Sequence, residues 1–306
     1  MQKPKVVHLT IVHKRYDSRI FCKECISLSE AGYDVSLIVA DGLGNETKQG
    51  VKIIDVGRAE SSRIKRMIRT SRKAVDLALG MNADIYHFHD PDLLIEALRL
   101  RKKACVIFDS HEDFPALMKQ RDYIPDFARK VLFRLCTLIE KYSAKRLSAV
   151  VCATETIQDK FARYGNIKAV VVKNYPVFSS CESETTNSYD TMKPVCYVGG
   201  LTALRGVKEM VEACNKAGVK LLLAGEFDNQ AYFEQIKAMP EWSNVEFLGY
   251  VPTSQVREKV YNRSSVGLVL LHKAPNHTHS IPIKQLEYMQ AGLPVVASRE
   301  VEFCKQ

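Results

Sequence analysis

Histidines and acids cluster after two expected strands in the first half of the sequence. Phe108–Pro115 reads FDSHEDFP and contains four ionisable side chains: Asp109, His111, Glu112 and Asp113. An imidazole donates and accepts protons near neutral pH, so His111 could bind a hydroxyl or orient a reacting group. A surface loop could also carry these side chains as solvated charges. We expect His111 to belong to a functional site.

A second histidine-rich run, Tyr86–Pro91 (YHFHDP), ends the preceding strand. His87 and His89 are two residues apart and therefore share one face of the strand. They could line a ligand cleft, pack in the core or bind a metal ion. Only Asp90 and Asp92 offer carboxylates at ligand spacing, so no metal site is predicted. His13, which follows the first expected strand, could likewise face a cleft or be structural.

Two glycines and an arginine that could bind a ligand follow the first expected strand of the second half. The run Tyr197–Gly206 (YVGGLTALRG) contains Gly199 and Gly200, which let the backbone approach a ligand, and Arg205. Arg205 stands just before an expected helix, where its charge and the helix dipole add for an anion. The other interpretation of the run is a glycine turn with a solvated arginine.

The segment Ser280–Ser298 (SIPIKQLEYMQAGLPVVAS) predicts a short helix followed by a buried strand. Ser280 can cap the helix, and Pro282 fits its first turn. Gly292 suits the left-handed position after the last helical residue. Lys284 and Glu287 lie near the positive end of the helix, where they could hold a phosphate and a sugar diol together.

Alternating strands and helices must position these residues. We expect first-half strands over residues 6–10, 34–40, 51–56, 84–88, 104–108, 150–153 and 169–172, with helices over 19–31, 61–79 and 127–147. Second-half strands are expected over 195–198, 220–224, 245–248, 266–271 and 293–297, with helices over 207–216, 230–238 and 253–262. This alternation predicts parallel sheets with right-handed crossovers. The G-x-G-x-x-G fingerprint does not follow the first strand, which weighs against a nicotinamide or flavin enzyme.

The helical pattern lapses in a polar, hydrophobe-poor run that reads as a linker. We therefore predict an α/β protein with a first domain over residues 1–175, a linker over 176–193 and a second domain over 194–306. Each domain should be a Rossmann-like, doubly wound parallel sheet, with both facing one cleft. Ligands in such folds bind at the carboxyl ends of the strands.

Charge and cysteine content indicate which partners and which cellular location to expect. The net charge is +9, and residues 1–175 alone hold 31 Lys and Arg against 21 Asp and Glu, or +10. This one-sided charge favours an anionic partner for the first domain, such as a membrane surface. Nucleic acid is not expected, because the basic residues lack interleaved aromatic residues or a recognised module. Nine cysteines, several in apolar runs, and the lack of a signal-peptide pattern predict a cytoplasmic protein, peripheral at the inner face of the plasma membrane.

The motifs together resemble the family 4 glycosyltransferases of the GT-B fold, which are retaining enzymes that use nucleotide sugars. PIKQLEYMQAGLPVVAS is similar to the donor-site segment of that family, and YVGGLTALRG to its diphosphate loop. LGYVP resembles the base-contacting turn, and IFDSHEDFP the loop whose histidine faces the donor sugar. HLTIVHKRYDSRIFCKE is similar to a bacterial subgroup that builds cell-surface polysaccharides.

The resemblance assigns a role to each matching residue. It implies that Glu287 binds the ribose hydroxyls, that Arg205 and Lys284 bind the diphosphate, and that His111 contacts the transferred sugar. His279 occupies the place of a second glutamate of the family. The remaining substrate-binding candidates are Gly199, Gly200, His13 and His89.

The implied reaction moves a sugar from a nucleotide-diphosphate sugar to a lipid-linked or other saccharide acceptor, without a cofactor or a metal ion. The resemblance also implies roughly two further βα units beyond Gln306, so the second domain is expected to be incomplete. Two alternatives remain: an inactive, truncated chain that at most binds nucleotide sugar, and a sugar-nucleotide epimerase of the same fold.

Overall fold

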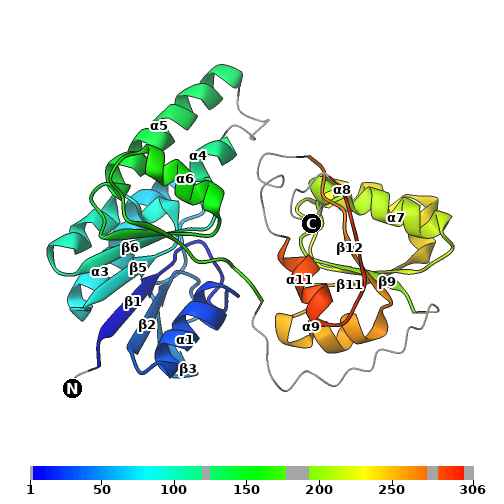
Figure 1. Ribbon diagram of the computed structural model, residues 1–306, viewed down its shortest axis with the longest axis horizontal. Coiled ribbons are helices and arrows are strands. Elements are labelled where there is room, and N and C mark those ends of the chain that lie inside the picture. The colour runs from blue at the N-terminus through cyan, green and yellow to red at the C-terminus, as the bar shows by residue number, and fades with distance from the viewer. Residues whose placement is uncertain (1–2, 119–124, 177–192, 274–281, 300–306) are drawn as a thin grey trace. The chain divides into compact units, whose positions relative to one another are not determined.

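The chain folds into two compact units, Met1–Asn174 and Tyr175–Gln306 (Figure 1). The computed structural model describes residues 3–118, 125–176, 193–273 and 282–299. Almost all of the expected linker lies outside the described residues, as do His279 and Ser280. Each unit contains one sheet, and the two are described separately.

The first unit is built on an eight-stranded sheet in the order β3-β4-β2-β1-β5-β6-β7-β8. All neighbouring strands are parallel except β3, which pairs antiparallel with β4. The predicted parallel sheet is thereby confirmed. The strands are β1 (Lys5–Leu9), β2 (Asp34–Val39), β3 (Glu46–Lys48), β4 (Val51–Asp55), β5 (Ile85–Phe88), β6 (Cys105–Ser110), β7 (Ala149–Cys152) and β8 (Ala169–Val171).

Helices cover both faces of this sheet (Figure 1). They are η1 (Ile20–Cys25), α1 (Ile26–Glu30), α2 (Arg63–Lys65), η2 (Arg66–Thr70), α3 (Ser71–Met81), η3 (Pro91–Leu93), η4 (Glu96–Lys102), α4 (Phe114–Leu117), α5 (Asp126–Ala144) and α6 (Glu155–Arg163). Residues of α3, η4 and α6 share one core with alternate residues of β1 and β5, including Leu9 and Phe88. Ile20 and Phe21 of η1 pack with Val35 and Leu37 on the opposite face. Period-two burial in the strands therefore directs alternate side chains to two different cores.

The helix expected over residues 61–79 is not one regular amphipathic α-helix. Ala74, Val75 and Ala78 of α3 are buried, but the side chains of Ile64 and Ile68 are 70% and 60% exposed. The segment contains a π-helical stretch, η2, between α2 and α3. A π turn contains more residues than an α turn, so it shifts the phase of the residues before it relative to those after it.

Two arginines of the same segment form ion pairs with one carboxylate of η3. Arg63 Nε lies 3.2 Å from Asp92 Oδ1, and Arg66 Nη2 lies 2.8 Å from Asp92 Oδ2. Asp92 is buried. These two arginines therefore neutralise a buried carboxylate, so their charges are paired inside the unit.

The second unit holds a five-stranded parallel sheet in the order β11-β10-β9-β12-β13. Its strands are β9 (Val195–Val198), β10 (Leu221–Ala224), β11 (Val245–Gly249), β12 (Val266–Val269) and β13 (Val295–Ala297). The helices are η7 (Ala203–Arg205), α7 (Val207–Lys216), α8 (Gln230–Lys237), η8 (Pro240–Asn244), α9 (Thr253–Lys259), η9 (Tyr261–Arg263) and α11 (Ile283–Gln290). This sheet confirms the second predicted α/β fold.

Helix α11 is fixed at its end and along its buried side. Gly292 has φ +72°, Gly292 N donates to Met289 O, and Leu293 N donates to Tyr288 O. This is the Schellman arrangement that a left-handed glycine permits, as predicted. Tyr288 packs so closely on β12 that a Cβ on Gly267 would lie 2.4 Å from its ring. The helix begins at Ile283, with Pro282 at the cap position rather than inside the first turn.

Candidate functional site

The first candidate site lies where β5 and β6 end in the first unit. Asp109, the second-last residue of β6, is fully buried. His111 Nε2 lies 2.8 Å from Asp109 Oδ2, and His89 Nδ1 lies 3.3 Å from the same oxygen. His111 is half-buried, so its ring connects a buried carboxylate with the protein surface. A carboxylate that holds one ring nitrogen orients the imidazole for work at the other.

Arg19 completes the coordination of this carboxylate. Its Nε donates to Asp109 Oδ2 at 2.8 Å, and its Nη2 donates to Asp109 Oδ1 at 2.9 Å. Burial would raise the pKa of Asp109, but hydrogen bonds from His111, His89 and Arg19 hold it well below its usual range. Asp109 is therefore an ionised, doubly paired anion inside the unit.

His13 forms a second histidine–carboxylate pair beside the first. His13 Nδ1 lies 2.8 Å from the buried Asp90 Oδ1, and the rings of His13 and His111 have their centroids 5.0 Å apart. Burial disfavours the charged form of His13, but the hydrogen bond and charge of Asp90 outweigh it, and the pKa of His13 is raised. Asp90 Oδ2 also accepts hydrogen bonds from Thr10 Oγ1 and Val12 N. The predicted residues His13, His89 and His111 are thus brought together.

The second candidate site is a cavity of about 440 Å³ at the carboxyl ends of β9, β10 and β11. Its walls include the backbone after β9 (Gly199 and Gly200), the end of β10 (Gly225) and Lys284 of α11. The remaining lining residues are Val198, Ala224, Glu226, Phe227, Asp228, Tyr250, Val251, Thr253 and Val256. This is the edge at which parallel sheets bind ligands.

Lys284 and Glu287 lie side by side on α11. Lys284 Nζ is 2.6 Å from Glu287 Oε2, and the Tyr261 hydroxyl donates to the same oxygen at 2.7 Å. Burial and the neighbouring Glu287 charge raise the pKa of Tyr261, so its hydroxyl remains a donor. The helix therefore presents an ammonium group next to an oriented carboxylate, and Lys284 reaches the cavity wall.

The three glycines that line the cavity differ in the space that a side chain would have. Gly199 has φ +155°, and a Cβ there would lie 2.9 Å from Tyr197 Oη. A Cβ on Gly225 would lie 1.8 Å from Gly199 O. Gly200 differs, because its Cβ would meet nothing within 4 Å. Backbone packing therefore requires glycine at 225. At 199 a Cβ would press on the Tyr197 hydroxyl, and at 200 the space lies open.

Arg205 is placed as predicted, two residues before α7 begins at Val207. Its Nη1 lies 3.4 Å from Tyr197 Oη, and a Cβ on Gly199 would lie 3.1 Å from the same nitrogen. The guanidinium group is thus held against the glycine turn that borders the cavity. His279, the remaining predicted site residue, lies outside the described residues.

Several participants were not predicted from the sequence. Arg19 is the N-cap of η1 and Glu24 lies within it. Glu24 N donates to Arg19 O five residues earlier, so both side chains lie on one side of the helix. Apolar periodicity gives no signal for charged residues on a buried face of a helix. Tyr261 was likewise missed, because nothing in its neighbourhood signals a contact with Glu287 at a separation of 26 residues.

Comparisons with known proteins agree on both units. Residues 23–174 match the family model described as Glycosyltransferase Family 4, and residues 193–305 match the one described as Glycosyl transferases group 1. No curated protein sequence matches the chain significantly.

Solved structures share the fold at low sequence identity. A sucrose-phosphate synthase from Thermosynechococcus elongatus is 15% identical with a TM-score of 0.70, and the alignment covers 97% of this chain and 82% of that one. HepE from Anabaena, solved with UDP and glucose, is 13% identical with a TM-score of 0.69, over 99% and 82% of the two chains. WaaG, a glycosyltransferase involved in lipopolysaccharide biosynthesis, is 12% identical with a TM-score of 0.71, over 98% and 82%.

Proposed function

The chain is a glycosyltransferase of the family 4, GT-B group, and we propose that it transfers a sugar from a nucleotide-diphosphate sugar to a lipid-linked saccharide. We further propose that the transfer retains the anomeric configuration and needs no metal ion at the reacting sugar. The observation that carries the proposal is the pairing of Lys284 and Glu287 beside the glycine-walled cavity.

The donor binds, in this proposal, at the carboxyl ends of β9, β10 and β11. Glu287 accepts hydrogen bonds from the ribose hydroxyls through Oε1, because the contacts from Tyr261 and Lys284 both end on Oε2. Lys284 and Arg205 bind the diphosphate, whose oxygens also meet the backbone at Gly200. The structure of HepE in complex with UDP-glucose supports this class of donor for the fold.

The chemistry follows from where charge develops. As the glycosidic bond breaks, negative charge grows on the leaving diphosphate and the sugar becomes oxocarbenium-like. Arg205 and Lys284 stabilise that negative charge most strongly in the transition state. His111 contacts the transferred sugar in this proposal. Asp109 orients the imidazole of His111, and the rings of His13 and His89 lie next to it.

The acceptor side is proposed to lie against a membrane. Helix α5 carries a row of exposed apolar side chains at helical spacing: Phe127, Val131, Leu135, Leu138 and Tyr142. Exposed basic residues, including Lys130 and Arg134, flank the row. Apolar side chains beside cations are what an amphipathic helix needs to bind an anionic lipid surface. No helix among the described residues is long and apolar enough to cross a bilayer.

Ile64 and Ile68, which are also exposed, belong to a segment next to α4. Arg63, from the same segment, lies over the Phe114 ring of α4 at 4.9 Å, and α4 packs against α5. The two apolar groups therefore belong to neighbouring elements of one unit. A lipid-linked acceptor held at this surface would explain why the net charge of +10 falls on the first unit.

The function is tested by incubating the chain with a panel of nucleotide sugars, with and without membrane extract that supplies lipid-linked saccharides. Transfer of the sugar to extractable lipid, with release of the nucleoside diphosphate, is the expected result. Conversion of the nucleotide sugar into an epimer without an acceptor would identify the epimerase instead. Binding without turnover of any donor would identify a chain that only binds nucleotide sugar.

A further inference from the structure

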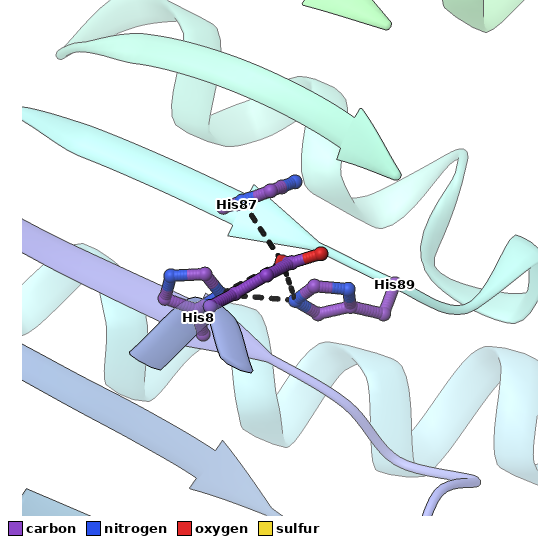
Figure 2. A group of neighbouring side chains, drawn as sticks. His8, His87 and His89 are labelled. Carbon is purple, nitrogen blue, oxygen red and sulfur yellow. Dashed lines mark hydrogen bonds and ion pairs between the residues drawn. The ribbon is translucent and has the colours of Figure 1, made fainter. Parts of the chain in front are cut away.

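Three histidines and a glutamate meet between the first sheet and η1. His8 comes from β1, His87 and His89 come from the end of β5, and Glu24 comes from η1. His8 and His87 occupy paired positions on adjacent parallel strands. Figure 2 shows the three imidazoles around one carboxylate oxygen. His8 and His89 are fully buried, whereas the side chains of His87 and Glu24 are 11% and 15% exposed.

The facing atoms lie close together. Glu24 Oε2 is 4.0 Å from His8 Nδ1, 3.8 Å from His87 Nδ1 and 3.9 Å from His89 Nε2. His8 Nδ1 and His89 Nε2 are 2.9 Å apart. One ligand atom from each of the four side chains lies within 4.8 Å of all the others. Four side chains from β1, η1 and the end of β5 therefore place one nitrogen or oxygen atom each in the same small region.

We propose that His8, Glu24, His87 and His89 bind one divalent transition-metal ion, of which Zn²⁺ is the best representative. Tetrahedral zinc takes nitrogen and oxygen ligands at about 2.0–2.2 Å, which places the ligand atoms about 3.4 Å from one another. The separations here fall on both sides of that value, so small side-chain rotations complete the sphere. Imidazoles with one carboxylate form a ligand set that suits zinc, copper or nickel better than calcium or magnesium.

Without an ion this arrangement leaves polar groups poorly satisfied. Neither carboxylate oxygen of Glu24 has a hydrogen bond among the described residues. Oε1 of Glu24 has an ion pair with Arg19 Nε at 3.1 Å, whereas Oε2 faces the histidines. A buried carboxylate normally keeps partners for both oxygens. A bound cation would supply the partner that Oε2 lacks.

Neighbouring residues favour this position of the ion over another. His89 presents Nε2 to the cluster and Nδ1 to Asp109 Oδ2, 3.3 Å away, which is the carboxylate–histidine–metal arrangement that orients a ligand. A second group, His89 with Asp109 and His111, also has metal-ligand spacing. Arg19 already donates to both oxygens of Asp109, whereas it reaches only Oε1 of Glu24 and leaves Oε2 without a hydrogen bond. The ion is therefore assigned to the side of His89 that faces away from His111.

This position implies a bracing role. The ion would join β1, β5 and η1, and through His89 it would fix the carboxylate that orients His111. The sugar transfer itself would need no metal contact with substrate, so the proposed reaction and the proposed ion are independent. The prediction from sequence that no residue binds a metal would then be wrong for His87 and His89.

The test uses the full chain after chelation and dialysis, titrated with Zn²⁺ alone and then with Co²⁺ alone. We expect one tightly held ion per chain by elemental analysis, an intense visible absorption band with Co²⁺ and a raised thermal midpoint with Zn²⁺. Replacing His8 and His87 together by leucine should abolish all three signals. Glu24→Gln, which keeps the shape of the side chain, should weaken Zn²⁺ binding by at least about tenfold.

Two matched variants separate this site from others. His272→Leu removes an exposed histidine of the second unit and should leave the stoichiometry at one. His111→Asn removes a member of the alternative group and should also leave it unchanged. The proposal is overturned if the wild-type chain retains no ion, if Glu24→Gln binds Zn²⁺ as tightly as the wild type, or if His111→Asn loses the ion.

Discussion

Arg19 and Asp109, 90 residues apart in sequence, form a bidentate ion pair inside the first unit, with nitrogen–oxygen distances of 2.8 and 2.9 Å. Both residues are buried, at 4% and 0% exposure. The pair joins the start of η1 to the end of β6, and the same carboxylate holds His111. Stability and site geometry therefore depend on one buried anion.

Removing that anion should destabilise the first unit strongly. Asp109→Asn leaves the Arg19 charge buried without its partner, and we expect a loss of about 3–5 kcal/mol in the free energy of unfolding. Lys52→Ala is the control, because Lys52 and Asp34 form an ion pair on the surface and its loss should cost at most about 1 kcal/mol. Urea denaturation measures both, and equal losses would contradict the account.

The histidine cluster predicts acid sensitivity of the metal-free protein. Burial, then the neighbouring His89, lower the pKa of His87 to about 3, whereas an unfolded chain binds that proton near 6.5. Between these values the unfolded state holds more protons, so stability should fall as the pH drops from about 6.5 toward 3. Other buried groups nearby, Glu24 and Asp109, titrate in the same molecule, so a variant must isolate the contribution of His87.

His87→Asn isolates it. The slope of unfolding free energy against pH in this window should decrease by up to about 1.4 kcal/mol per pH unit, the contribution of one proton. His272→Asn, at an exposed position, should leave the slope unchanged. Denaturant titrations in the presence of a chelator provide the measurement. An unchanged slope in His87→Asn would show that its imidazole titrates normally in the folded chain.

Two glycines of the second unit should respond differently to alanine. Gly225→Ala places a Cβ against Gly199 O at φ +149°, so we expect a loss of more than about 2 kcal/mol in stability. Gly200→Ala meets open space, so stability should change little. If the diphosphate approaches the backbone there, donor affinity should fall about tenfold or more. Calorimetric titration with the donor separates the outcomes, and unchanged affinity would remove Gly200 from the donor site.

The row of apolar residues on α5 should govern membrane binding. Leu138→Ser removes an exposed leucine and should weaken sedimentation with anionic vesicles about tenfold, because a leucine side chain contributes about 1.5–3 kcal/mol when buried. Lys130→Glu with Arg134→Glu should weaken it further, by roughly 1 kcal/mol for each residue. Leu43→Ser is the control, because Leu43 is at least as exposed as Leu138 but distant in sequence. Vesicle binding that survives both α5 changes would exclude this helix as the contact.

Most elements could be predicted from the sequence, because apolar periodicity encodes them locally. The helix expected over 207–216 and the strand expected over 195–198 have the observed bounds. Strand β3 was missed because its residues, Glu46–Lys48, are polar and rely on pairing with β4. Helix α6 was missed although Thr154 caps it through its hydroxyl. The exposure of Ile64 and Ile68 could not be foreseen either, because periodicity gives no warning of a π turn.

The candidate sites were predicted in part, for a similar reason. Residues directly after strands, such as His111 and Gly199, can be assigned to the ligand-binding edge of the sheet, because parallel strands all end at that edge. Arg19 and Glu24 depend on a π-helical turn that brings two charged side chains to one buried face. Their partners lie in distant strands, and pairing of that kind is fixed only by the tertiary fold.

The proposed donor site is tested most directly by the thermal midpoint of the wild-type chain and of Glu287→Ala with each of several nucleotide sugars. A ligand that binds the folded state raises the midpoint, and one at 100 times its dissociation constant contributes about 2.7 kcal/mol. We predict a rise for one donor in the wild type and none in Glu287→Ala, with both proteins folded alike in its absence. The same rise in both proteins would contradict the assignment of Glu287 to the ribose.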